Sequence, residues 1–169
     1  MTLKIGLVGA ESTGKSTLGK ALASQLGGEY IEEYARTYIG QLGKAYTYDD
    51  VCHIAKHQID SLTTDYSAPY IFFDTELIIT KVWFDVKYGR RPDWFDRAYS
   101  QIKCDKYLLL MPDIAFAYDP LRENPDKREE LTTLYEQELC LLSANYTKIT
   151  GQQEERLINA RNAIRNLKI

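Results

Sequence analysis

The chain has 169 residues, of which 44% are hydrophobic and 27% are charged, a composition typical of a globular domain. Its formal net charge of -3 gives no general electrostatic reason to bind nucleic acid or an anionic membrane, and no apolar run approaches the ~18 residues that a membrane span requires. We expect a single cytoplasmic domain over residues 1–169, because the first residues enter a strand at once and leave no room for a signal peptide.

The first predicted strand, Leu3–Val8, leads directly into a phosphate-loop motif. The motif reads Gly9-Ala10-Glu11-Ser12-Thr13-Gly14-Lys15-Ser16-Thr17. It matches the Walker A pattern G-x-x-x-x-G-K-[ST], and the helix-forming segment Ser16–Leu26 follows it, which is the context that the pattern requires. A chance Gly-Lys-Ser turn is the weaker interpretation, and we expect all nine residues to contact the nucleotide.

The residue types in this motif suit the binding of a nucleoside triphosphate. Gly9 and Gly14 permit backbone angles that direct successive N–H groups at phosphate oxygens, and the following helix adds its dipole. Lys15 supplies a charge for the β- and γ-phosphates, and the Ser16 hydroxyl is a ligand for Mg²⁺. The sequence therefore predicts ATP and Mg²⁺ as cofactors.

The rest of the chain alternates predicted strands and helices. Further strands are expected at Glu29–Glu32, Tyr70–Asp74, Lys106–Met111 and Tyr146–Thr150. Helices are expected at Glu33–Gly43, Tyr48–Asp65, Thr75–Tyr88, Asp93–Lys103, Asp126–Ala144 and Gln153–Leu167. The irregular segment at about residues 113–128 is predicted to be a lid. This order predicts the α/β fold class, as a three-layer P-loop NTPase fold with a five-stranded parallel sheet, like that of nucleoside and nucleotide kinases.

Several carboxylates and one glycine follow the ends of predicted strands, where ligands bind in such a sheet. Asp74 either reaches Mg²⁺ or its water shell, accepts the proton of an attacking hydroxyl, or caps the next helix. Glu32 and Glu33 either hold the hydroxyl of an acceptor or form a solvated charge pair at a helix start. Gly151, after the last strand, is expected to border the purine.

Two further groups of side chains have a functional and a structural interpretation. Arg122, in the lid segment, is the arginine that we expect to stabilise charge on the transferring phosphoryl group, although an exposed charged loop is the alternative. His53 and His57 share one helix face, but Ile54 stands where the zinc-protease pattern needs glutamate. A metal site at the histidines is therefore disfavoured.

Two other classes of phosphate-loop protein lack their signatures here. A signalling GTPase has Asp-x-x-Gly and Asn-Lys-x-Asp, whereas Asp74 precedes Thr75-Glu76-Leu77, and Thr147-Lys148-Ile149 precedes Thr150. A mechanical ATPase usually has glutamate directly after the strand-end aspartate, where this chain has Thr75. A small-molecule kinase fits best, with a hydrolytic ATPase or regulatory nucleotide switch, or a non-catalytic nucleotide sensor, as the alternatives.

Four segments carry a closer resemblance. They are the phosphate loop, Glu33-Tyr34-Ala35-Arg36, Phe73-Asp74-Thr75, and Pro112-Asp113-Ile114 with Asp119-Pro120-Leu121-Arg122. In this order the chain resembles, over nearly its whole length, the ribosylnicotinamide kinase domain of NadR-type proteins in the P-loop kinase superfamily. The resemblance implies ATP-dependent phosphorylation of nicotinamide riboside at its 5′-hydroxyl, which gives nicotinamide mononucleotide for NAD biosynthesis.

The resemblance also assigns roles by position. It implies that Glu33, Tyr34, Arg36 and Asp74 line the riboside site, and that Arg122 belongs to the lid. Asp74 is the favoured base for the acceptor hydroxyl, and Glu33 is the competing candidate. The small-molecule substrate is the one expected partner.

The chain departs from these relatives in two motifs and in domain content. The relatives have Asp-Gly-x-Arg where this chain has Asp119-Pro120-Leu121-Arg122, and an aromatic residue where it has Glu32. An acid at Glu32 suits a cationic pyridinium but equally marks a different acceptor, so another nucleoside or nucleotide kinase is the nearest alternative. Longer NadR-type proteins add a helix-turn-helix and an adenylyltransferase domain, neither of which is expected in this chain.

Overall fold

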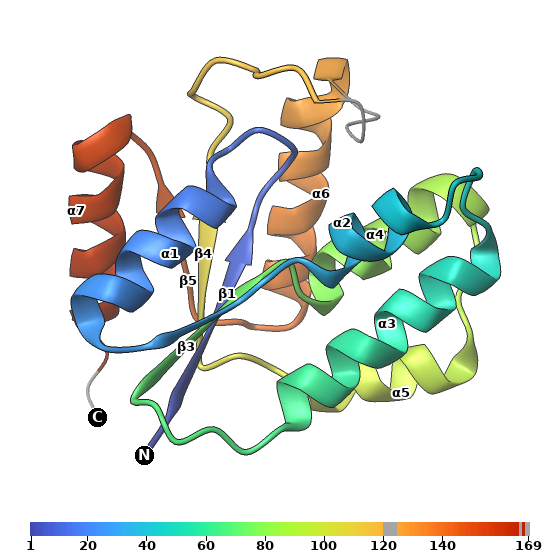
Figure 1. Cartoon of the computed structure of the whole chain (residues 1–169), viewed down its shortest axis with the longest axis horizontal. Helices are drawn as coiled ribbons and strands as arrows, with labels where there is room; N and C mark the ends of the chain where they lie inside the picture. Colours follow the sequence, from blue (N-terminus) through green and yellow to red (C-terminus); the bar gives the residue numbers. More distant parts are fainter. Residues whose placement is uncertain (120–124, 166, 168–169) are drawn as a thin grey trace.

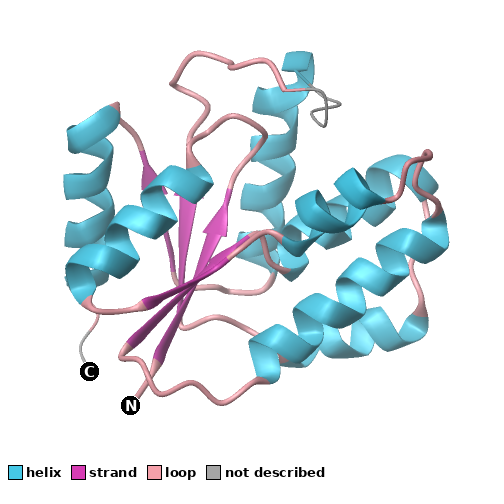
Figure 2. Ribbon diagram, viewed as in Figure 1, coloured by secondary structure: helices cyan, strands magenta, loops and turns pink. Residues whose placement is uncertain are grey.

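The computed structural model describes residues 1–119, 125–165 and 167. Its strands form one parallel sheet in the order β2-β3-β1-β4-β5 (Figures 1 and 2). The strands are β1 (Leu3–Val8), β2 (Glu29–Ile31), β3 (Tyr70–Asp74), β4 (Lys106–Leu110) and β5 (Tyr146–Ile149). The predicted fold class is confirmed, and each predicted strand agrees with the observed one to within one residue at its carboxyl end.

Helices cover both faces of this sheet (Figure 1). On one face lie α1 (Lys15–Leu26) and α7 (Gln153–Arg165). On the other lie α3 (Tyr48–Thr63), α4 (Leu77–Tyr88), α5 (Asp93–Gln101) and α6 (Arg128–Leu141), with α2 (Tyr34–Gln41) packed on α3. The three-layer arrangement that the sequence predicts is therefore present.

The hydrophobic core has two parts because side chains along a strand point alternately to the two faces. Ile5 and Leu7 of β1 join the cluster beneath α1 and α7. Val8 joins the cluster beneath α3, α4 and α6. The central strand is thereby buried on both sides, as expected for a parallel sheet.

Local capping explains where α3 and α4 begin. Thr47 caps α3 and forms a capping box with Asp50. The helix predicted from Thr75 begins instead at Leu77. Thr75 has a φ of 76°, outside the helical region, and the Glu76 carboxyl group accepts a hydrogen bond from the Ile78 N–H at 3.0 Å. Glu76, and not Asp74, therefore caps α4, which leaves the Asp74 carboxylate for another role.

Most of the other predicted helices are shorter than expected, whereas α1 begins one residue earlier, at Lys15. The helix predicted from Asp126 to Ala144 is α6, which a 3₁₀ turn at Pro125–Lys127 precedes. The segment at 113–119 has no regular structure, as expected for the first part of the predicted lid. Arg122 lies outside the described residues.

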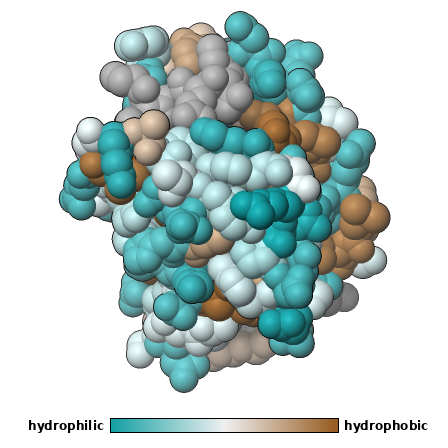
Figure 3. Space-filling model, turned by 90° about the vertical axis from the view of Figure 1, so that its right-hand side faces the viewer, coloured by the Kyte–Doolittle hydropathy of each residue, from teal (hydrophilic) through white to brown (hydrophobic). Residues whose placement is uncertain are grey.

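The surface of the molecule is mixed in character. No helix within the described ranges is long and apolar enough to span a membrane. The side of the molecule that carries α2 to α5 is largely hydrophilic, with separate hydrophobic patches (Figure 3).

Glu76 links the stability of this fold to pH. Its side chain is buried, and burial raises the pKa of the carboxyl group from 4.5 to about 8, although the backbone N–H groups at the start of α4 oppose the shift. The folded chain therefore holds a proton here that the unfolded chain has released. The stabilisation from this proton is complete below pH 4.5 and is lost as the pH rises to about 8.

We expect Glu76→Gln to remove this loss, because glutamine keeps an acceptor for the helix cap and carries no charge. The free energy of unfolding of wild type and variant, measured with urea from pH 4.5 to about 8, tests this expectation. The variant should gain stability relative to wild type as the pH rises. A difference that stays constant over this window would contradict the assignment.

Candidate active site

The phosphate loop joins β1 to α1 at the carboxyl edge of the sheet (Figure 1). Gly14, the residue before α1, has a φ of 82°, in the left-handed region that favours glycine. A Cβ at Gly9 would lie 2.8 Å from Thr13 Oγ1 and 3.0 Å from the Leu110 carbonyl oxygen. Gly14 is therefore needed for its backbone angle, and Gly9 for close packing.

The Lys15 ammonium group lies over this loop. Its Nζ donates hydrogen bonds to the carbonyl oxygens of Gly9 at 2.9 Å and Ala10 at 3.0 Å. The Thr13 hydroxyl also donates to the Ala10 carbonyl, at 2.8 Å, and stiffens the turn. Of the other predicted loop residues, Glu11 is half-buried and Thr17 is exposed on the first turn of α1.

Asp74 ends β3 beside this loop, with 2% of its surface exposed. Its Oδ2 accepts hydrogen bonds from Ser16 Oγ and from Tyr30 Oη, both at 2.5 Å. Its Oδ1 is buried and has no hydrogen-bond partner among the residues that the structure describes. Buried carboxylate oxygens are normally paired, so Oδ1 is available for a ligand.

These two side chains fit a magnesium ion. Mg²⁺ prefers oxygen ligands and is usually bound through one or two protein groups together with phosphate oxygens and water. Ser16 and Asp74, which the sequence predicts as metal ligands, supply a hydroxyl and a carboxylate in direct contact. Within the described ranges, no group of three or more His, Cys, Asp or Glu side chains offers a metal site.

The two glutamates that follow β2 have different surroundings. Glu33 is half-buried, and burial raises the pKa of its carboxyl group, while the positive charge of Lys15 opposes the shift and the carboxylate of Asp74 adds to it. Glu32 is exposed and pairs with Lys20 of α1 at 3.7 Å. The structure thus brings Glu33, and not Glu32, beside the phosphate loop.

Tyr34 begins α2 and packs on α3. Its ring stacks on His57 with ring centroids 3.6 Å apart, and its hydroxyl lies 2.9 Å from His53 Nε2. Tyr38 continues this contact, with its ring 4.8 Å from that of His53. The helix face that the two histidines share therefore holds Tyr34 in place.

Arg36 connects α2 to the described part of the lid segment. Its guanidinium group forms an ion pair with the Asp119 carboxylate, which raises the pKa of Arg36. Arg36 is half-exposed, whereas the Asp119 side chain is largely buried. Because Arg122 lies outside the described residues, its role stays a prediction.

The lid segment also contacts the phosphate loop directly. The Ala117 N–H donates to Ser12 Oγ at 2.8 Å. Arg128, at the start of α6, donates through Nη2 to the carbonyl oxygens of Ser12 and Ile114, both at 3.0 Å. Ser12 has a φ of 57°, and contacts from both ends of the lid segment hold it in this conformation.

Arg156 of α7 is a site residue that sequence reasoning missed. It is 4% exposed and joins three loops. Its guanidinium donates to the carbonyl oxygens of Gly151 at 2.8 Å, Met111 at 3.1 Å and Thr13 at 3.2 Å. It also pairs with the Asp113 carboxylate. An arginine in an otherwise polar terminal helix gives no sequence signal of this position, because its partners lie far away in the chain.

Gly151 is held by the ion pair between Arg156 and Asp113. Its N–H donates to Asp113 Oδ2 at 2.8 Å, and its carbonyl oxygen accepts from Arg156 Nε. Its φ of 95° again favours glycine. The residue that the sequence places beside the purine is therefore fixed relative to the phosphate loop.

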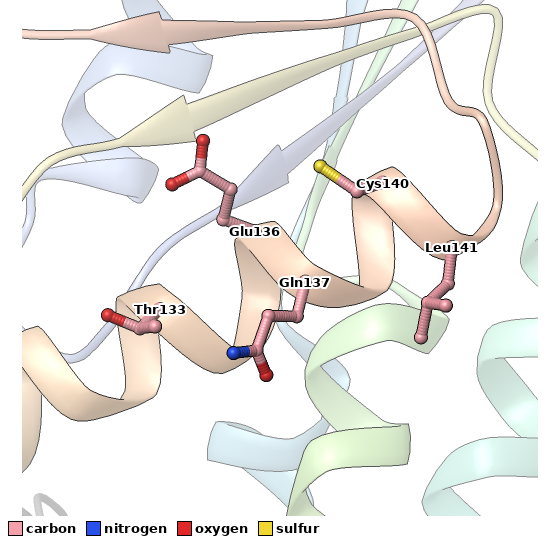
Figure 4. A pocket seen from close by; sticks show the side chains of 5 residues that line it. All are labelled: Thr133, Glu136, Gln137, Cys140 and Leu141. Carbon is pink, nitrogen blue, oxygen red and sulfur yellow. The ribbon is translucent and has the colours of Figure 1, made fainter.

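Two surface hollows lie away from the phosphate loop. One, of about 600 Å³, is on the outer face of α6 and is lined by Thr133, Glu136, Gln137, Cys140 and Leu141 (Figure 4). The other, of about 420 Å³, lies between β5 and α7 and includes Lys106, Thr147 and Asn159. Neither hollow includes a predicted site residue.

Comparisons with known sequences agree with the predicted resemblance. A family model described as an AAA domain matches residues 4–156. The trifunctional NAD biosynthesis/regulator protein NadR of Escherichia coli (strain K12) is 27% identical over 160 residues, or 89% of this chain. The matched region is 38% of the length of that relative, so the chain spans well under half of it.

Comparisons with solved structures agree on the fold. A NadR protein in complex with NR has a TM-score of 0.79 and 22% identity, over 96% of this chain and 48% of that chain. Deoxyadenosine kinase from M. mycoides, with products bound, has a TM-score of 0.69 and 16% identity, over 98% of this chain and 100% of that chain. The P-loop fold of NadR and of nucleotide kinases is thus confirmed for this chain.

The contacts of Arg156 predict a large stability cost for its removal. Arg156→Met leaves three carbonyl oxygens and the Asp113 carboxylate without their donor. We expect a loss of about 3 kcal/mol in the free energy of unfolding, measured with urea. Arg161→Met, on the same helix, is the control and should lose much less, because its bond to Gln25 is long, at 3.5 Å, and exposed. Equal losses would refute the role given to Arg156.

Proposed function

This chain belongs to the AAA domain family, and we propose that it is an ATP-dependent kinase that phosphorylates the 5′-hydroxyl of nicotinamide riboside. One observation carries the proposal: the Asp74 carboxylate contacts Ser16 of the phosphate loop, and the charges of Lys15 and Asp74 both act on Glu33. The likeness to a NadR protein in complex with NR supports the choice of acceptor. The product would be nicotinamide mononucleotide.

The chain matches only part of its longer NadR relative. We propose that residues 1–169 act as one kinase domain. The NadR relative is trifunctional and is more than twice as long as the region matched here. Its other activities are not assigned to these residues.

The phosphate loop would hold the donor. Its backbone N–H groups and the amino end of α1 would bind the phosphates of ATP, and Lys15 would turn from the loop carbonyls toward the β- and γ-phosphates. Ser16 and Asp74 would hold Mg²⁺. When bound, Mg²⁺ neutralises charge that develops on the transferring phosphoryl group.

Glu33 is the side chain that we assign as proton acceptor. Ser16 and Tyr30 already share one Asp74 oxygen, which favours a metal-binding role for Asp74. Burial raises the pKa of Glu33, which makes it a better base than an exposed carboxylate. Glu33 would therefore take the proton of the attacking hydroxyl, while Lys15 stabilises charge on the phosphates.

The charges around Glu33 favour a cationic acceptor. The carboxylates of Asp74 and Glu11 both act electrostatically on Glu33 and raise its pKa. A nicotinamide riboside carries a positively charged pyridinium ring, which these carboxylates attract. An acceptor that already carries a phosphate would be repelled unless Arg36 left Asp119 to bind it.

Release of ADP from Mg·ATP with a panel of acceptors tests the function. The panel contains nicotinamide riboside, common nucleosides, nucleoside monophosphates, and no acceptor. We expect strong stimulation by nicotinamide riboside alone. Stimulation by another nucleoside would keep the kinase and replace the substrate, whereas equal release with and without every acceptor would favour an ATPase switch.

Glu33→Gln tests the assigned base, with Glu32→Gln as a matched control on the neighbouring residue. Loss of a general base should lower kcat by about 100-fold or more, with little change in the KM for ATP. Glu32→Gln should leave kcat nearly unchanged, because Glu32 is exposed and pairs with Lys20. Similar kinetics in both variants would sink the assignment.

A further inference from the structure

Tyr30, in β2, belongs to none of the sequence motifs, yet its hydroxyl reaches the catalytic edge. It donates to Asp74 Oδ2 at 2.5 Å, and Ser16 Oγ donates to the same atom at the same distance. Both donors therefore hold one oxygen of the carboxylate. The other oxygen, Oδ1, is buried and has no hydrogen-bond partner in the described part of the chain.

Gly19, inside α1, explains how the Tyr30 ring reaches this position. A Cβ at Gly19 would lie 2.8 Å from Tyr30 Cδ2 and Cε2, and 2.7 Å from Leu7 Cδ1. Real Cβ atoms do not approach other atoms so closely, so an alanine would displace the ring or the helix. Glycine weakens a helix interior relative to alanine, so its place here needs a packing reason, which the ring supplies.

The ring of Tyr30 is packed between α1 and β1. Lys20 Nζ lies 5.3 Å from the ring centroid, on the side toward solvent. Leu7 and Gly19 pack against the inner part of the ring, so its hydroxyl is held toward Asp74.

We propose that Tyr30 is a positioning residue for phosphoryl transfer, and that Gly19 makes its position possible. With Ser16, Tyr30 fixes the rotation of the Asp74 carboxylate, so that Oδ1 is the oxygen presented to the metal or the substrate. The kinetic consequence rests on the proposed kinase function. The orientation of the carboxylate does not, and can be measured separately.

Steady-state kinetics of Tyr30→Phe test the first part. Removal of a group that orients a ligand side chain typically costs about tenfold or more in activity or metal affinity. We expect kcat to fall by about tenfold and the KM for Mg·ATP to rise, while the KM for the acceptor changes little. Tyr70→Phe, in the adjacent strand, is the control and should keep wild-type kcat. Wild-type kcat in Tyr30→Phe would overturn the proposal.

Gly19→Ala tests the second part through a double-mutant cycle. The variant should lower kcat in the wild-type background, because the new Cβ displaces the tyrosine ring. In the Tyr30→Phe background the same change should have almost no further effect on kcat, because the hydroxyl is already absent. An equal effect in both backgrounds would overturn the role given to Gly19. Thermal unfolding of all four proteins separates this coupling from loss of fold.

Calorimetric titration with ADP, with and without Mg²⁺, tests the orientation without turnover. Tyr30→Phe should bind ADP alone as wild type does but should bind Mg·ADP more weakly. Equal binding of Mg·ADP by both proteins would overturn the proposal. If the wild type transfers phosphate to no acceptor, the proposed function fails, and this titration still decides whether Tyr30 orients Asp74.

Discussion

One oxygen atom of Asp74 joins the elements on which the site is built. Asp74 ends β3, Ser16 lies in the first turn of α1, and Tyr30 comes from β2, so the two hydrogen bonds to Oδ2 connect three separate parts of the chain. The bonds are charge-assisted and largely buried, which strengthens them. The phosphate loop, the acidic edge and the second strand therefore keep one relative position, and Glu33 follows two residues after β2.

A second charged group organises the opposite half of the same edge. The Arg156 guanidinium binds the loops that follow β1, β4 and β5, and its charge is matched by Asp113. A planar guanidinium with five donors can bind three carbonyl oxygens and a carboxylate at once, whereas a lysine has only three donors. The site is thus held by a shared carboxylate at one end and a shared guanidinium at the other.

The sequence predicted the fold and the phosphate loop well, because both depend on local patterns. The strand ends and the phosphate-loop glycines follow from residue types that are neighbours in the chain. Tyr30 and Arg156 could not be predicted in this way, because their partners are far away in sequence and only the folded sheet brings them together. The two glutamates after β2 look alike in sequence, and only their differing burial distinguishes Glu33 from Glu32.

The order of strands has a consequence for how the chain acquires its structure. β1 is made before both of the strands beside it. Leu3 of β1 pairs with Tyr70 of β3, and Ile5 pairs with Lys106 of β4, so both partners come much later in the chain. The backbone N–H and C=O groups of β1 cannot all be paired until the chain has been made as far as β4. Contacts between such distant segments make folding slow and leave apolar surface open in the meantime. The strand that carries the phosphate loop therefore has two unpaired edges for a large part of the time in which the protein is being made.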